Sequence, residues 1–396
     1  MVIGVTFIGR NPGLQGGIEL SLFASYREAW YNFSIRNWQF LYLNILMFVP
    51  FGILFPLLHQ CFRKVRWTIG TAALFTLTIE TLQSLTGLGI FDADDLFNNL
   101  LGAVIGYGLV MGMIALRERT VKRVLLYFSP LLLVIVLSGS MFTYYHLKEF
   151  GNLDIVPVYK KDMTDAKITV DVKLNENKLT VPVYKAPSYT KEEADKFATD
   201  FFHRLNIDTS NLEVVSYPET GIYSVEGYGI FFEYIDGSYS FISHNPERKR
   251  ADTDEESLKE HLVKFGFEIP EDAHFQRVDT GIYTWKADKI MKGNKLIDGT
   301  LTVDYNHDDT VGWINNKIVI YEKVRDVEIK SGQEAYQEIL DGKFTGYTKN
   351  KKLESLHIEK VELSYYLDSK GFYQPVYAFY GAWDGEDTTI LIPGMQ

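Results

Sequence analysis

Four hydrophobic stretches follow one another between residues 39 and 145. They cover residues 41–59, 67–85, 96–116 and 124–145. A helix needs roughly 20 apolar residues to cross the hydrocarbon core of a bilayer, and each stretch is close to that length. The pattern therefore predicts a bundle of four transmembrane helices that has the lipid bilayer as its partner.

Two short basic loops separate these stretches and set their orientation. The loops contain Arg63, Lys64 and Arg66, and then Arg117, Arg119, Lys122 and Arg123. Basic residues next to helix ends stay on the cytoplasmic side. The protein is therefore expected to be a multi-pass cell-membrane protein whose chain beyond about His146 is extracytoplasmic.

The charge balance differs between the two halves of the chain. Residues 1–150 contain 11 Lys and Arg against 8 Asp and Glu, a net charge of +3, whereas the remaining residues contain 29 against 43, a net charge of −14. Nucleic-acid binding requires a basic face, and the second half of the chain is acidic. A nucleic-acid partner is therefore excluded. We expect a transmembrane domain over 1–145 and an acidic extracytoplasmic domain over 146–396.

Cys61 is the single cysteine and lies in the first basic loop. An exported domain without disulfides fits a Gram-positive surface better than a eukaryotic secreted protein, and a periplasmic domain remains compatible.

At the N-terminus, residues 1–9 are apolar but too short to span a bilayer. We interpret them as the remainder of a truncated first helix whose true start lies upstream of Met1; a short interfacial segment is the alternative.

Polar residues gather near the predicted outer ends of the helices. Ionisable groups in a membrane are costly, which makes each a candidate for function. The candidate outer-face site consists of Arg27, Asn44, Glu80, Gln83, Asp92, Asp94, Asp95 and Asn99. The competing interpretation of Asn44, Gln83 and Asn99 is that their amides form hydrogen bonds between helices. Asn98 is expected to face outward.

Three aspartates within four residues need a further explanation. One is explained as a helix cap, with Asp94 as the cap or Asp95 in the first turn. Like charges this close require a cationic group: Arg27 is our leading candidate, and a divalent metal or a ligand cation are the others. The spacing is not that of an EF-hand, so no metal site is assigned, and no cofactor is expected.

Small residues and a proline mark predicted helix packing. Gly102 and Gly106, like Gly108 and Gly112, repeat at a spacing of four, and Pro50 with Gly52 predicts a kink in the first of the four helices. The glycine spacing is typical of close helix contact, within the chain or between chains.

The exported half alternates amphipathic helices with strands. Helices are predicted over 191–205, 253–265 and 331–340, and strands within 227–242, 300–323, 358–367 and 373–380. A Thr-Gly-Ile-Tyr sequence follows each of the first two helices, at Thr220 and Thr280. The pattern predicts an α+β domain of repeated helix and antiparallel-sheet units near 186–250, 251–325 and 326–396.

Four motifs in the membrane half, in order along the chain, carry a resemblance to the VanZ-like family. They are residues 25–30 (SYREAW), 44–52 (NILMFVPFG), 80–83 (ETLQ), and 91–95 (FDADD) with Asn99 and Gly102. The resemblance implies a cell-envelope protein connected with tolerance to glycopeptide antibiotics such as teicoplanin, without an agreed reaction. The chain departs from the family in its first helix and in lacking a basic residue before the FDADD motif.

A second resemblance lies in the exported half. Residues 364–377 resemble the terminal part of YycH/YycI-like regulators, which restrain sensor kinases, and PepSY-type domains share the same alternation of helix and sheet. No H-E-x-x-H or G-x-S-x-G motif occurs in the sequence. The protein is therefore expected to be non-enzymatic.

Three functions follow from these observations. The first is a VanZ-like envelope protein that affects the encounter of a glycopeptide or a cell-wall precursor with the cell surface. It would carry an exported sensor or scaffold domain. The second is a regulatory partner of a membrane sensor kinase. The third is an intramembrane enzyme acting on a lipid-linked envelope precursor, with Glu80 as acid or base and the aspartates holding a metal or a cationic group.

Overall fold

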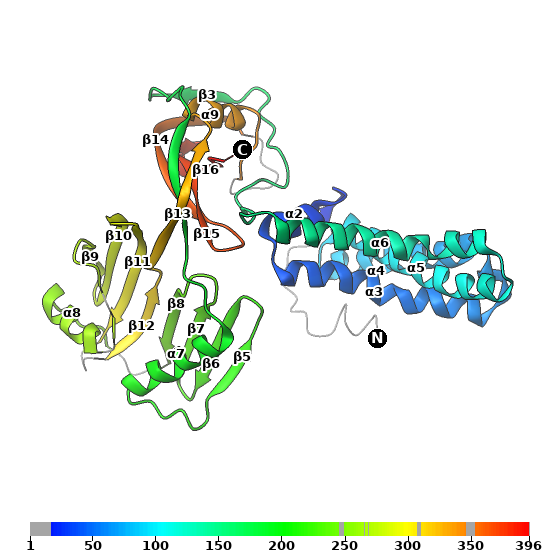
Figure 1. Cartoon of the computed structure of the whole chain (residues 1–396), viewed down its shortest axis with the longest axis horizontal. Helices are drawn as coiled ribbons and strands as arrows, with labels where there is room; N and C mark the ends of the chain where they lie inside the picture. Colours follow the sequence, from blue (N-terminus) through cyan, green and yellow to red (C-terminus); the bar gives the residue numbers. More distant parts are fainter. Residues whose placement is uncertain are drawn as a thin grey trace. The chain divides into compact units, whose positions relative to one another are not determined.

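The computed structural model describes residues 17–244, 249–264, 266–267, 269–306, 310–345 and 353–395 (Figure 1). The chain divides into two compact units, Met1–Asp154 and Ile155–Gln396. The predicted truncated helix over 1–9 lies outside the described residues. The first unit extends beyond the boundary expected at 145 because residues 148–152 contact its helices: Asn152 Nδ2 donates to the Trp30 carbonyl, and Lys148 Nζ donates to Asn152 Oδ1.

The first unit is helical. Its elements are β1 (Ile18–Glu19), α2 (Ala24–Asn32), α3 (Ile35–Leu58), the 3-10 helix η1 (Gln60–Arg63), α4 (Val65–Thr86), β2 (Phe91–Asp92), α5 (Ala93–Arg117) and α6 (Val121–Leu147). The four predicted long helices are all present. The short helix α2 and the parallel pairing of β1 with β2 were not predicted.

Three of these helices, α3, α5 and α6, are long and apolar enough to cross a membrane among the residues described. The prediction of four such helices is therefore not confirmed. Helix α4 is 22 residues long, but its threonines together with Glu80 and Gln83 lower its mean hydropathy.

Helix α5 is the centre of the bundle. It contacts α3, α4 and α6, and more than half of its apolar stretch is buried, whereas none of the corresponding stretch of α6 is. Glycines allow its close approach to α3: a Cβ on Gly102 would meet the Ile45 carbonyl, and one on Gly106 would meet the Val49 carbonyl. On the facing helix, a Cβ on Gly52 would meet the Ala103 carbonyl.

The glycines of the second pair face the last helix. A Cβ on Gly108 would meet the Tyr127 carbonyl, and one on Gly112 would meet the Phe128 ring, both in α6. Small residues at such positions let helix backbones approach closely. The glycine faces of α5 are thus occupied by neighbours within this chain.

The second unit is built on a 14-stranded sheet. Its elements are β3 (Lys167–Val170), β4 (Leu179–Lys185), α7 (Lys191–Arg204), β5 (Glu213–Ser216), β6 (Thr220–Val225), β7 (Tyr228–Glu233), β8 (Tyr239–Ser243), α8 (Glu255–Lys264), β9 (His274–Asp279), β10 (Ile282–Lys292), β11 (Lys295–Tyr305), β12 (Val311–Asn316), β13 (Val319–Ile329), α9 (Gly332–Leu340), β14 (Ser355–Leu367), β15 (Phe372–Trp383) and β16 (Glu386–Pro393). The main path of neighbouring strands is β3-β14-β15-β4-β13-β11-β12-β8-β7-β6-β5. Strands β4 and β13 thus join the C-terminal strands to the rest of the sheet.

The predicted helices and hairpins of this unit correspond to α7, α8, α9 and their strands. Helices α7 and α8 pack on the sheet through Phe201, Phe202, Leu258 and Leu262, which are all buried. The two Thr-Gly-Ile-Tyr sequences lie at the start of β6 and around the start of β10. No strand range was predicted for β3, β4, β5, β6, β9, β10 or β16.

Candidate functional site

The amino end of α5 begins at Asp92. The Asp92 carboxylate accepts a hydrogen bond from the Asp94 N–H at 2.8 Å, and Asp92 is the N-cap residue. The prediction of Asp94 as the cap is therefore wrong, whereas Asp95 lies in the first turn of α5 as predicted. The backbone of Asp92 is extended because β2 pairs with β1, and an extended residue before the first helical turn is the N-cap position.

Asp94 has a different role, since it holds the start of α2. Its fully buried carboxylate accepts hydrogen bonds from the backbone N–H of Phe23 at 2.5 Å and of Ser25 at 2.8 Å. The first N–H groups of a helix have no partner within that helix and carry partial positive charge. Two of the three clustered aspartates thus lie at helix N-termini, which stabilise their negative charge.

Side chains of three further helices reach the first two turns of α5. Tyr26 in α2 donates to Asn98 Oδ1, and Asn44 in α3 donates to Asp95 Oδ1. Asn98 is fully buried, so the expectation that it faces outward is wrong.

Helix α4 supplies the remaining partners. Asn99 Nδ2 donates to Thr76 Oγ1 at 2.8 Å. Glu80 and Gln83 are 2 % and 4 % exposed, and Glu80 Oε2 accepts from the Asp92 N–H at 3.4 Å. The structure therefore brings Asn44, Glu80, Asp92, Asp94, Asp95 and Asn99 together around one helix end.

Arg27 lies on the exposed side of α2 and donates to the Leu22 carbonyl at 3.5 Å. Its pairing with the aspartates stays a prediction. The backbone partners of the Asp94 carboxylate could not be foreseen from sequence, because Phe23 and Asp94 are 71 residues apart.

Burial raises the pKa of two titratable groups at this helix end, Tyr26 and Asp92. Burial, followed by the charge of Asp94, raises the pKa of Tyr26 to about 12. The Tyr26 hydroxyl therefore remains a hydrogen-bond donor to Asn98 at neutral pH. Burial also raises the pKa of Asp92, against the hydrogen bond from the Asp94 N–H.

Two buried amide atoms at this helix end have no hydrogen-bond partner in the described part of the chain. They are Asn98 Nδ2 and Asn99 Oδ1. Buried polar atoms are nearly always satisfied, so each unsatisfied one calls for an explanation. Among the described residues, no group of three or more His, Cys, Asp and Glu side chains is placed to hold a metal ion.

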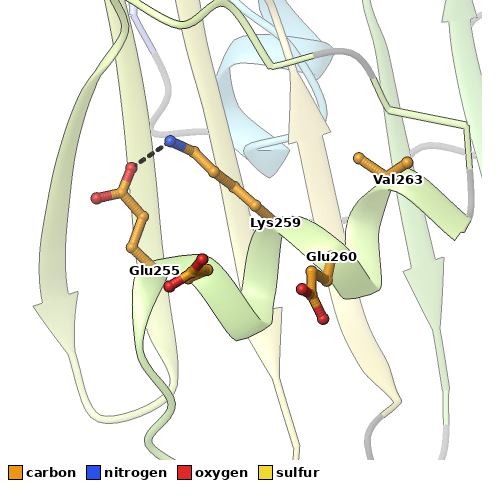
Figure 2. Close-up of a pocket in the computed structure, with 5 residues that line it drawn as sticks. Glu255, Lys259, Glu260 and Val263 are labelled. Atoms are coloured by element: carbon orange, nitrogen blue, oxygen red, sulfur yellow. Dashed lines mark ion pairs between the residues drawn. The ribbon is translucent and has the colours of Figure 1, made fainter.

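The second unit carries a surface feature of its own. A hollow of about 660 Å³ lies along α8, lined by Glu255, Glu256, Lys259, Glu260 and Val263. Figure 2 shows the Lys259 and Glu255 side chains pointing toward each other, and their ion pair measures 2.6 Å. These residues all come from one helix, and the pair neutralises the one cation among them, so we do not regard the hollow as a functional site.

Comparison with solved structures finds two distant similarities. An uncharacterized protein from Eubacterium rectale ATCC 33656 is 11 % identical, with a TM-score of 0.29, over 57 % of this chain and 87 % of that one. The Bacillus megaterium YpeB C-terminal domain is 10 % identical, with a TM-score of 0.19, over 53 % of this chain and 95 % of that domain. Similarities this low support no argument about function. No curated protein matches the chain.

The family comparison concerns the membrane unit. The model of the VanZ/LLP1 family matches residues 2–116, a range that contains the four resemblance motifs and every residue of the polar site. The predicted resemblance is thereby confirmed. The N-terminal part of this chain, which contains the polar site at the amino end of α5, is thus similar to the VanZ/LLP1 family over residues 2–116.

Proposed function

We propose that this protein lowers the susceptibility of its cell to glycopeptide antibiotics of the teicoplanin type, and that the polar site at the amino end of α5 carries this effect. The observation that supports the proposal most is the convergence of buried and half-buried polar side chains from α2, α3 and α4 on two turns of α5. The VanZ/LLP1 match supplies the connection with antibiotic tolerance.

Glu80→Gln is expected to abolish this effect. The substitution keeps the shape of a side chain that is 2 % exposed but removes its charge. The test expresses the full chain in a susceptible Gram-positive host and measures the minimum inhibitory concentration of teicoplanin. We expect the wild-type chain to raise it and the Glu80→Gln chain to return it to the value of the empty vector.

Glu118→Gln is the matched control. Glu118 lies at the opposite end of α5, where its half-exposed side chain pairs with Arg123 at 3.6 Å. Its substitution should leave the teicoplanin response of the wild-type chain unchanged. A wild-type chain without effect on teicoplanin sensitivity would refute the proposal.

The same proposal places the polar end of the bundle and the whole second unit outside the cell. Support comes from the basic loop around η1 and from the basic residues between α5 and α6, which favour the cytoplasmic side. We further propose that the exported unit is a sensor or scaffold for a cell-wall precursor or a membrane partner.

Cys61 allows a direct test of this orientation. It is the single cysteine, and it is exposed in η1. A membrane-impermeant maleimide added to intact cells should leave Cys61 unlabelled and should label it after the cells are permeabilised. In a Cys61→Ser, Glu226→Cys chain, the exposed position at the β6–β7 turn should be labelled in intact cells. Labelling with the two positions reversed would contradict the orientation.

A regulatory role through the exported unit is the second candidate. It is favoured by the contact of residues 148–152 with α2, because α2 also binds Asp94 at its other end. Residues 146–396 on an unrelated single-helix anchor, compared in the teicoplanin assay, distinguish the two. A retained effect would assign the function to the exported unit and make the polar site dispensable.

A further inference from the structure

We infer that this protein forms a two-fold symmetric dimer in which strand β5 of one copy pairs antiparallel with β5 of a second copy. The inference concerns the second unit alone and does not depend on the proposed function.

Strand β5 is an open edge of the sheet. In the part of the chain that the structure describes, it pairs with β6 only and ends the path of neighbouring strands (Figure 1). Tyr217 donates its N–H to the Thr220 carbonyl of β6 at 2.9 Å. Because successive residues of an antiparallel strand direct their N–H and C=O groups to opposite sides, those of Val215 also point to β6. The N–H and C=O groups of Val214 and Ser216 therefore point away from β6, where a further strand can bond to them.

The other edge strands carry features that discourage pairing, and β5 does not. Strand β9 contains Arg277 and a register shift against β10, β3 begins with Lys167, and β16 ends with Pro393. Basic residues, prolines and bulges are the usual protection of a sheet edge. The β5 sequence, Glu-Val-Val-Ser, has none of them, and Val214 and Val215 are 42 % and 50 % exposed. An unprotected apolar edge is a template for pairing with another strand.

The repeat within this unit shows that the fold does not require an apolar edge at this position. In the row across the sheet that contains Ile222, the neighbours are Val215 of β5 and Phe231 of β7. Around the isoleucine of the second Thr-Gly-Ile-Tyr sequence, the same two positions are Asp279 and Asp304. The apolar row at the β5 edge is therefore suited to contact with a partner, and packing within the unit does not explain it.

A second copy is the occupant because β5 is complementary to itself. A two-fold axis at Val215 sets Val215 opposite the same residue of the second copy and Glu213 opposite Tyr217. Val214 and Ser216 then meet across the axis and exchange hydrogen bonds, and paired side chains project to the same face. No like charges oppose each other, whereas an axis at Val214 would set Val215 opposite Glu213. One patch used by both copies is the arrangement of the commonest protein dimers.

The experiment crosslinks the full-length chain in the membranes of the expressing cell. Cys61→Ser gives a chain without cysteine, to which Val215→Cys is added. Side chains opposite each other at a position without direct hydrogen bonds have Cβ atoms about 4.5–5.5 Å apart, so a small adjustment allows a disulfide. Copies with two different tags are expressed together and oxidised with copper phenanthroline. We expect a disulfide-linked dimer that contains both tags.

Two other cysteine positions are the matched controls. Glu226→Cys lies in the exposed β6–β7 turn of the same hairpin and should give no dimer above background. Glu213→Cys has Tyr217 opposite and should also fail to crosslink alone. A chain that carries both Glu213→Cys and Tyr217→Cys should form the dimer.

Val214→Pro tests the hydrogen bonds between the two strands. The N–H that this change removes faces away from β6, so proline fits the folded chain but removes a bond to the second copy. Added to the Val215→Cys chain, it should abolish most of the crosslinked dimer while the Tm of the purified chain stays unchanged. If this variant does not fold, the comparison of Val215→Cys with Glu226→Cys still decides.

Three results would overturn the inference. Equal dimer yields from Val215→Cys and Glu226→Cys would show that copies meet by random collision. A dimer from Glu213→Cys alone as abundant as that from Val215→Cys would exclude this register. Full crosslinking of a folded chain with both Val214→Pro and Val215→Cys would show that the strands do not pair through their backbones.

Discussion

Gly102→Ala is expected to lower the free energy of unfolding of the membrane unit by about 3 kcal/mol, the upper end of the range for overpacking. The added Cβ would meet the Ile45 carbonyl of α3. A backbone carbonyl cannot rotate away as a side chain can, so α3 and α5 must separate. Thermal unfolding of the purified chain in detergent measures the effect, together with the yield of folded protein.

Gly70→Ala and Gly139→Ala are the controls for this prediction. Both glycines lie inside long helices, and a Cβ at either position has nothing within 4 Å. Alanine is a better helix former than glycine by about 1 kcal/mol, so neither change should destabilise the protein. If Gly102→Ala unfolded at the same temperature as these controls, close packing of α3 against α5 would be contradicted.

Asp94→Ala is expected to release the start of α2. The substitution leaves the N–H groups of Phe23 and Ser25 without the carboxylate that now accepts from both. Losing hydrogen bonds to a buried charged group costs about 2 kcal/mol, which corresponds to roughly 30-fold faster exchange of these amide hydrogens. Hydrogen exchange followed by mass spectrometry of peptides covering α2 measures the change.

Two further variants serve as comparisons for the Asp94→Ala prediction. Asp94→Asn keeps one carbonyl oxygen as an acceptor and should accelerate exchange by less than Asp94→Ala. Glu28→Ala changes an exposed residue of α2 and should leave exchange at the wild-type rate. Equal exchange in Asp94→Ala and Glu28→Ala would show that Asp94 does not hold α2.

The sequence by itself determined the four long helices of the first unit and the helices and several strands of the second. Hydrophobic stretches of spanning length marked α3 to α6 within a few residues, because helix formation there follows from length and composition. Alternating residues within 227–242 marked the strands of the β7–β8 hairpin, since the side chains of a strand alternate between two faces. The order of the VanZ-like motifs also identified the membrane unit.

Only the tertiary structure decided how the polar residues are used. The sequence placed three aspartates together but could not show that Asp94 binds α2, because Phe23 is 71 residues away along the chain. Likewise, Asp92 rather than Asp94 caps α5 because β2 pairs with β1, and Asn98 is buried because α2 lies against it. Spacing along one helix fixes which residues share its face, whereas the partner of each face is set by which distant segment packs there.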